Sequence, residues 1–139
     1  EPYDSQTRAA SGILCGDFNA EPDSDEIRFL CGFTPIDGRD TWWQESWRST
    51  GRVDPGYTQH PSNPNYAPFN LPPKRIDYVF VGSTWLVKDN PAHAADPRPR
   101  TRGRVMNAEV VFDEVLTGRV ASDHYGLHVT VSWPGRPTS

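Results

Sequence analysis

Three short polar clusters, each beside an apolar segment, hold the residue types best suited to chemistry in this 139-residue chain. They are Gly16–Asn19, Arg75–Tyr78 and Ser122–Tyr125. A carboxylate close to a carboxamide, as in Asp17 and Asn19, suits a hard cation or a water held beside a phosphate. A carboxylate next to an imidazole, as in Asp123 and His124, can bind a metal and exchange protons. The residue types therefore predict metal-assisted or acid–base chemistry, provided that the fold brings the clusters together.

Each cluster lies at one end of an expected strand, which predicts where its side chains point. Residues i and i+2 of an extended segment share one face. Asp17 and Asn19 are therefore expected to project together, with Phe18 turned into the core. By the same rule, Arg75 and Asp77 are expected to share one face of their strand.

Each cluster also has an interpretation without a catalytic role. Asp and Asn favour the turn that follows a strand, so the first cluster could be a plain polar turn. A charge within an apolar strand is costly unless it is paired, so Arg75 and Asp77 could form a half-buried salt bridge. The third cluster could be a surface turn. Residue types and spacing leave these alternatives open.

Alternation and turn residues predict a strand-rich domain with one clear short helix. The helix begins at Ser24 or Asp25 and runs through Leu30, while Asp40–Trp43 begins either a strand or a helical turn. The first expected strand, Gly12–Gly16, is expected to be buried. The other expected strands are Arg75–Val81, Trp85–Lys88, Val105–Phe112 and Leu127–Trp133, and long Pro-rich loops are expected at 48–74 and 89–104.

Composition limits the classes of partner. Fourteen Lys and Arg against 18 Asp and Glu give a net charge of −4. This balance disfavours tight, non-specific binding along a nucleic-acid backbone. Nucleic acid is still a possible substrate, but the net charge gives no indication of it. Nowhere does the sequence carry the roughly 20 apolar residues of a membrane-spanning helix. Cys15 and Cys31 are expected to be buried free thiols, although one disulfide between them stays open.

Taken together and in this order, GDFNAEP (16–22), RIDYVFV (75–81) and SDHYG (122–126) resemble the endonuclease/exonuclease/phosphatase superfamily, the metal-dependent phosphoesterases related to DNase I. The resemblance implies an α/β fold that is part of a four-layer sandwich, with two packed sheets flanked by helices. It also implies hydrolysis of a phosphodiester or phosphomonoester by a metal-activated water, with Mg²⁺ or Mn²⁺ as cofactor. Asn19 and Arg75 would then bind the phosphate-ester substrate.

The same resemblance gives a role to the other polar residues of the clusters. Asp17 would bind the metal or orient the attacking water, and Asn19 would hold the scissile phosphate. Asp77 would pair with His124, fixing its tautomer and keeping it cationic against the phosphate. Asp123 would be a metal ligand or lie close to one.

The resemblance, which extends to Tyr57-Thr58, covers nearly the whole chain but only the C-terminal half of the family fold. Residues 1–139 are therefore expected to be that half, and the chain starts at Glu1, as a processed or excised piece would. The family's metal-binding Glu lies in the N-terminal half, which we expect to be supplied in cis or in trans. The chain alone is expected to expose sheet edges and to hydrolyse little. The alternative is a non-catalytic or split member that acts as a binding or assembly module.

Overall fold

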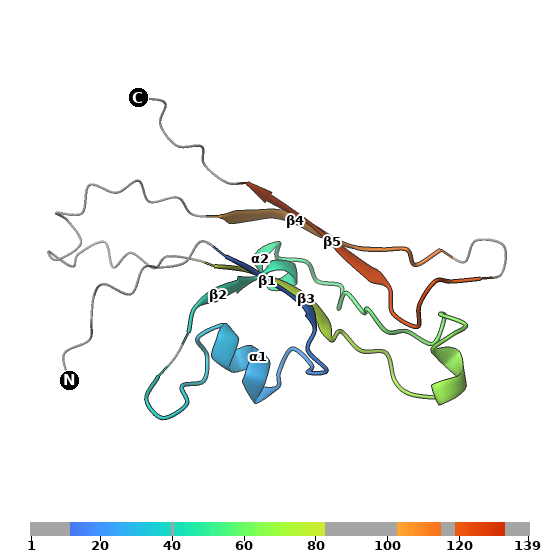
Figure 1. Cartoon of the computed structure of the whole chain (residues 1–139), viewed down its shortest axis with the longest axis horizontal. Helices are drawn as coiled ribbons and strands as arrows, with labels where there is room; N and C mark the ends of the chain where they lie inside the picture. The colour runs from blue at the N-terminus through green and yellow to red at the C-terminus, as the bar shows by residue number, and fades with distance from the viewer. Residues whose placement is uncertain (1–11, 40, 83–102, 115–118, 133–139) are drawn as a thin grey trace, which may run out of the picture.

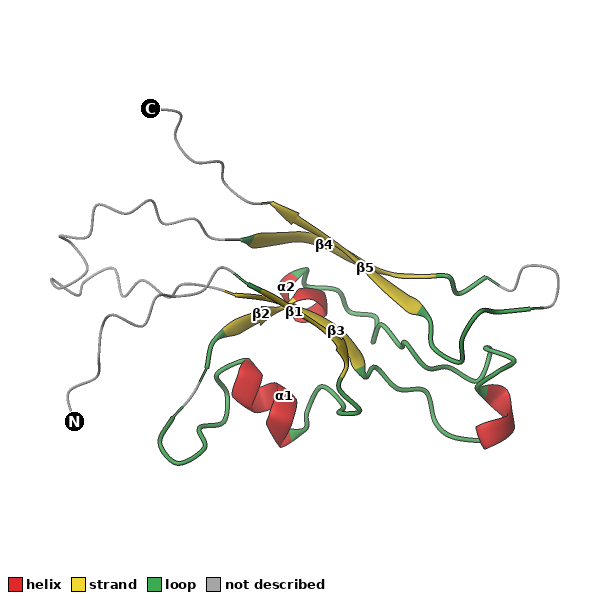
Figure 2. Cartoon of the chain, in the orientation of Figure 1, coloured by secondary structure: helices red, strands yellow, loops and turns green. Residues whose placement is uncertain are grey.

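The computed structural model describes residues 12–39, 41–82, 103–114 and 119–132 (Figure 1). The elements are β1 (Ile13–Asp17), α1 (Asp25–Leu30), β2 (Trp43–Glu45), α2 (Ser46–Ser49), a 3-10 helix (Ala67–Phe69), β3 (Asp77–Gly82), β4 (Arg104–Val111) and β5 (Gly126–Ser132). The strands form a three-stranded antiparallel sheet in the order β1-β3-β2 and a two-stranded antiparallel sheet of β4 and β5. Figure 2 shows α1 on the side of the larger sheet that faces away from β4 and β5.

The central strand, β3, carries most of the core of the larger sheet. Its aromatic and β-branched residues suit a buried strand, and Phe80 and Val81 are fully buried. Tyr78 and Phe80 pack with Ile27 of α1 and with Cys31, which follows it. The strand predicted over Arg75–Val81 is confirmed from Asp77 onward.

The edge strand, β1, forms where the sequence predicts a strand but is mostly exposed. It pairs with β3, and no strand of the described residues pairs with its other edge. Ile13 is 57% exposed as a result. The expectation of a buried strand is wrong, because burial needs a neighbour at the edge and cover on both faces. The two cysteines are free as expected, but Cys15 is exposed and only Cys31 is buried.

The predicted helix is present as α1, with Ser24 at its N-cap and Cys31 at its C-cap. Ile27 is its buried residue and anchors it to the sheet. Gly32 then turns the chain with a φ of +76°, and a Cβ at this position would come within 2.6 Å of the Trp42 ring. The helix therefore ends where only glycine fits both the backbone and the space.

Of the two alternatives for the segment after residue 39, the structure has a strand followed directly by a helix. β2 pairs with β3, and Glu45 then caps α2 by accepting from the backbone N–H groups of Trp47 and Arg48, each at 2.9 Å. α2 contacts both β3 and β4, so it lies between the two sheets (Figure 2). Residue 40 itself lies outside the described residues.

The strands predicted near the C-terminus are confirmed as β4 and β5. The strand predicted at Trp85–Lys88 lies outside the described residues, as does most of the loop predicted at 89–104. The described part is thus a small α/β fold with two sheets and few helices, and the four-layer arrangement stays a prediction. A helix long and apolar enough to cross a membrane does not occur in this part.

Candidate active site

The antiparallel pairing of β1 with β3 brings two of the three polar clusters together. Asp17 ends β1, Asp77 begins β3, and the two residues are direct partners in the register of the pair. The third cluster joins them because the backbone before β5 is bonded to the long loop, where the Tyr125 N–H donates to the Thr58 carbonyl oxygen at 2.7 Å. His124 consequently lies beside both carboxylates.

His124 and Asp77 form a hydrogen-bonded pair, with 2.8 Å between Nδ1 and Oδ2. Each side chain is 22% exposed, so the pair is partly shielded from water and still open to a ligand. An ionised carboxylate can only accept a hydrogen bond, so Nδ1 of the ring carries the donated proton. The structure therefore contains the contact between Asp77 and His124 that the resemblance implies.

Asp17, Asp77 and His124 form the group of possible metal ligands. Each offers one ligand atom, and these atoms all lie within 4.8 Å of one another. Asp123 is outside this group, with its Oδ2 4.0 Å from the other ring nitrogen of His124, Nε2. The structure thus gathers one polar residue from each cluster, with Asp77 at Nδ1 of the His124 ring and Asp123 near Nε2.

Asn19 leaves the strand instead of continuing it. Its φ is +49°, and its backbone N–H donates to Asp17 Oδ1 at 2.8 Å, which closes an Asx turn. The expectation that Asp17 and Asn19 share a face of an extended segment is therefore wrong. A turn sets the relative position of the two side chains, as expected if this cluster is a plain polar turn. The turn also keeps the two side chains close to each other along the chain.

The core holds this turn in place. The Phe18 N–H donates to the Ile76 carbonyl oxygen at 2.9 Å, and the Phe18 ring packs edge-on against Tyr78, so Phe18 turns inward as predicted. The Tyr78 hydroxyl lies 2.8 Å from the carbonyl oxygen of Ala20 and 2.9 Å from that of Arg75. Burial raises the pKa of Tyr78 well above its usual range, so the hydroxyl keeps its proton and stays a donor.

Thr58 connects the start of β3 to the segment before β5. It is fully buried, and its Oγ1 accepts from the backbone N–H groups of Ile76 and Asp77, each at 3.3 Å. Its carbonyl oxygen accepts from Tyr125, the residue after His124. Sequence reasoning missed this role, because a single threonine in a long loop forms no pattern and the resemblance at Tyr57-Thr58 assigns nothing to the hydroxyl.

Gln59 contacts the second ring nitrogen of His124. Its amide Nε2 lies 2.8 Å from His124 Nε2 and donates to this nitrogen in the tautomer whose proton is on Nδ1. The backbone of Gln59 exchanges two hydrogen bonds with Lys74, at 2.9 and 2.8 Å, so its position is fixed. Sequence reasoning missed Gln59 as well, and no residue pattern near it marks a contact with His124.

Arg75 lies apart from the ligand group. Its Nη1 is 2.9 Å from Glu45 Oε1, the two side chains are 7% and 2% exposed, and its guanidinium carbon lies 5.2 Å from the centroid of the Tyr78 ring. The salt bridge considered for Arg75 is therefore present, with Glu45 as the partner in place of Asp77. A contact of Arg75 with substrate stays a prediction.

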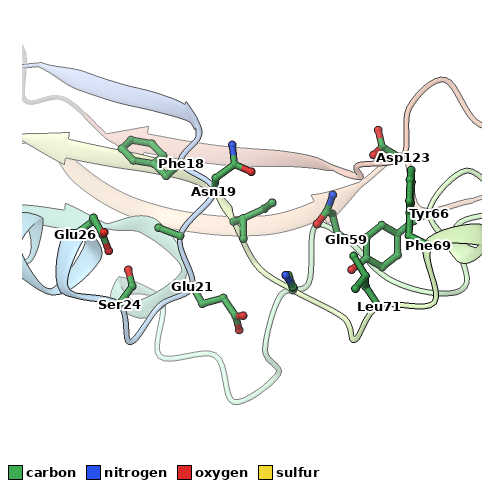
Figure 3. Close-up of a pocket in the computed structure, with 13 residues that line it drawn as sticks. Phe18, Asn19, Glu21, Ser24, Glu26, Gln59, Tyr66, Phe69, Leu71 and Asp123 are labelled. Carbon is green, nitrogen blue, oxygen red and sulfur yellow. The ribbon is translucent and has the colours of Figure 1, made fainter.

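A cavity of about 590 Å³ opens beside the cluster. Figure 3 shows Asn19 and Glu21 on one side of it and Gln59 and Phe69 on the other, with Asp123 above the second side. Two of the predicted site residues, Asn19 and Asp123, line this cavity. The site therefore has room for a ligand larger than a phosphate group.

Comparison with protein-family models matches residues 4–124 to the Endonuclease/Exonuclease/phosphatase family. The match covers most of the 139 residues and reaches from before Asp17 to His124, so it contains all three clusters up to the histidine. The resemblance inferred from the three motifs is thereby confirmed. No curated protein and no solved structure matches the chain.

Proposed function

We propose that this chain, which belongs to the Endonuclease/Exonuclease/phosphatase family, is part of a metal-dependent phosphoesterase. The observation that carries the proposal is the meeting of Asp17, Asp77 and His124, which come from three separate parts of the sequence. Gathering titratable groups in a partly shielded place costs free energy, and such groups are common where catalysis uses them. The family contains hydrolases of phosphoester bonds, so phosphoester hydrolysis is the reaction that we assign to this group. No observation among the described residues favours the non-catalytic alternative.

The residues present fit a hard divalent cation. Asp17 is exposed and offers a carboxylate oxygen, and Mg²⁺ needs few protein ligands because it keeps several of its waters. We propose Asp17 as a ligand and Asp123 as a second one or as a group that orients a bound water. When bound, Mg²⁺ or Mn²⁺ would offset the charge of the phosphate and lower the pKa of a coordinated water.

The protein's own side chains would then position the reactants. Asp17 would orient the attacking water, and Asn19, tied to Asp17 by its backbone, would donate from its amide to a phosphate oxygen. Asp77 would hold the His124 ring and stabilise positive charge on it, so that Nε2 can face the phosphate or transfer a proton. Gln59 is bonded to that nitrogen, so the substrate would exchange this hydrogen bond for its own.

We also propose that the chain supplies the C-terminal half of the catalytic domain, with the other half in cis or in trans. Among the described residues no strand pairs with the second edge of β1, and the Ile13 side chain is exposed. Both observations support this proposal, because a further strand or layer would cover them. The active-site residues Asp17 and Asp77 lie at the end of this same sheet, so the added half would border the site.

The test is hydrolysis of bis-p-nitrophenyl phosphate with Mg²⁺ or Mn²⁺, by the chain alone and by a longer protein expressed with the codons upstream of Glu1. We expect little turnover from the chain alone and clear turnover from the longer protein. His124→Ala should lower that turnover by about 100-fold or more. The matched control is His128→Ala, which removes an exposed histidine paired with Glu109 at 2.7 Å on the other sheet and should change nothing.

Two results would contradict the proposal in different ways. A longer protein that hydrolyses no phosphate ester, or one that is unaffected by His124→Ala, would overturn the catalytic assignment. Full turnover by the 139-residue chain alone would overturn only the assignment of a missing half and would leave the catalytic residues in place.

A further inference from the structure

The cavity beside the active site is a groove with two unlike walls (Figure 3). One wall is built by the segment after β1 and carries Asn19, Glu21 and Glu26. The other is built by the long loop and carries Tyr66, Phe69 and Leu71, with Gln59 nearer to His124. A ligand held by Asn19 at one end would therefore extend along an apolar wall.

The apolar wall is exposed yet firmly held. Phe69 is 59% exposed and Leu71 46% exposed, so both side chains present open surface. Behind them, Tyr66 is buried, its ring centroid lies 6.1 Å from that of Phe69, and its hydroxyl donates to the Pro72 carbonyl oxygen at 2.7 Å. Prolines at 68, 72 and 73 stiffen the segment. A preformed apolar surface of this kind binds a flat group without a cost of ordering.

The charges of the groove set a limit on the charge of its ligand. Three acidic residues, Glu21, Glu26 and Asp123, line it, against one basic residue, Lys74. A ligand with many phosphates would meet net repulsion along the groove, even with one cation at the site. A single phosphodiester anion could be matched by Lys74 or by a bound divalent cation.

We propose that the groove selects a small phosphodiester that carries one negative charge and a planar, uncharged ester group. This inference rests on the proposed function, since it assigns the phosphate to the Asn19 end. The planar group lies against Phe69 and Leu71, and the acidic residues of the opposite wall exclude polyphosphates. Phe69 and Leu71 are thus specificity residues that touch the ester group and not the reacting atoms.

The test measures binding, independently of turnover. Calorimetric titration with Mg²⁺ present compares phenyl methylphosphonate and methyl methylphosphonate, two anions of equal charge that differ in the ring. We expect the phenyl ester to bind about tenfold more tightly, which is the contribution of one stacked ring. Phe69→Ala should remove most of that preference and leave the affinity for the methyl ester unchanged. Phe112→Ala, which truncates an exposed phenylalanine outside the groove, is the matched control and should keep the preference.

Three results would each overturn the inference. They are equal affinity for the two esters, no binding of the phenyl ester at millimolar concentration, and binding of inositol hexakisphosphate that is tighter than binding of the phenyl ester. A preference that survives Phe69→Ala and Leu71→Ala together would also overturn it. The outcome is separable from that of the proposed function. A ring preference in a protein without hydrolysis would leave the groove assignment standing alone, and hydrolysis without a ring preference would remove only the groove assignment.

Discussion

Arg75 and Asp77 stand two residues apart on one segment, yet each belongs to a different kind of charged pair. Arg75 pairs with Glu45 at 2.9 Å, and the two side chains are 7% and 2% exposed. Asp77 pairs with His124 at 2.8 Å, and both side chains are 22% exposed. In the first pair Glu45 also caps α2, and the second pair lies beside the cavity of about 590 Å³.

The difference shows which charged residues stabilise the fold and which are available for chemistry. Each Glu45 oxygen accepts from a backbone N–H group, and Oε1 also faces Arg75, so both oxygens already have protein partners. His124 is held on both ring nitrogens by side chains, but it keeps access to solvent and to Asp17. A substitution in the first pair should therefore cost stability, and one in the second should cost activity.

The largest expected effect is on stability, from Arg75→Ala. Removing one partner of a buried pair leaves Glu45 charged and buried, so the free energy of unfolding should fall by about 3–5 kcal/mol. Urea denaturation followed by tryptophan fluorescence measures the loss. Arg75→Lys keeps the positive charge but not the planar guanidinium group, so it should lose less stability than Arg75→Ala.

The control for Arg75→Ala is a pair of the same type at the surface. Arg52 and Asp54 lie 3.7 Å apart with side chains 37% and 55% exposed, and Asp54→Asn should change stability by less than about 1 kcal/mol. Equal losses for Arg75→Ala and Asp54→Asn would show that burial does not separate the two kinds of pair.

The next largest effect is on activity, from Asp77→Asn in the longer protein. The amide keeps the shape of the carboxylate but cannot stabilise charge on His124, so hydrolysis of bis-p-nitrophenyl phosphate should fall by about 100-fold. The free energy of unfolding should change by less than about 1 kcal/mol, because the pair is partly solvated.

A second pair of acid and histidine provides the control for Asp77→Asn. Glu109 Oε1 lies 2.7 Å from His128 Nδ1 on the exposed face of β4 and β5, and Glu109→Gln should leave hydrolysis unchanged. A strong loss of stability in Asp77→Asn with little change in turnover would reverse the roles of the two pairs on this segment.

The sequence predicted the ends of the strands better than the partners of the side chains. Short motifs at strand ends marked Asp17, Asp77 and His124, because polar residues directly before or after an apolar run are a local signal. The partner of Arg75 could not be read in the same way, since Glu45 reaches it only through the pairing of β2 with β3. The exposure of β1 was missed for the same reason, because neighbours at an edge are set by the whole sheet.

The contacts that orient the side chains of the site could not be predicted from the sequence either. Thr58 and Gln59 act through single hydrogen bonds from an irregular loop, and such bonds leave no periodic pattern. Asn19 was predicted as a site residue and lines the cavity, but its expected geometry was that of a strand. The Asx turn that forms instead depends on a backbone hydrogen bond to Asp17 that residue types favour without fixing.

A smaller effect, on stability, should come from Tyr78→Phe, on the same segment as Arg75 and Asp77. The hydroxyl reaches the carbonyl oxygens of Arg75 and Ala20, so its loss should lower the free energy of unfolding by about 1–2 kcal/mol. Burial raises the pKa of Tyr78, so this contribution should be constant below about pH 10, the ordinary value of the unfolded chain, and decline above it. Denaturation at two pH values below and one above that point measures it.

Tyr66→Phe is the matched control for Tyr78→Phe, because the Tyr66 hydroxyl has one carbonyl partner, that of Pro72 at 2.7 Å. Its loss of stability should be smaller. A larger loss for Tyr66→Phe would mean that the loop, and not the turn after β1, depends more on its tyrosine.

The smallest expected effect, from Gln59→Ala, separates the two contacts on the His124 ring. Asp77 binds Nδ1 with a charged acceptor, while Gln59 contacts Nε2 through a neutral amide, which contributes about 1 kcal/mol. Hydrolysis in the longer protein should therefore fall by only about fivefold, with stability nearly unchanged. The loss should appear in kcat/KM, because Gln59 fixes the ring in the free protein, before the substrate takes its place at Nε2. A loss as large as that of Asp77→Asn would instead place Gln59 among the groups that hold the phosphate, and the neutral contact would then matter as much as the charged one.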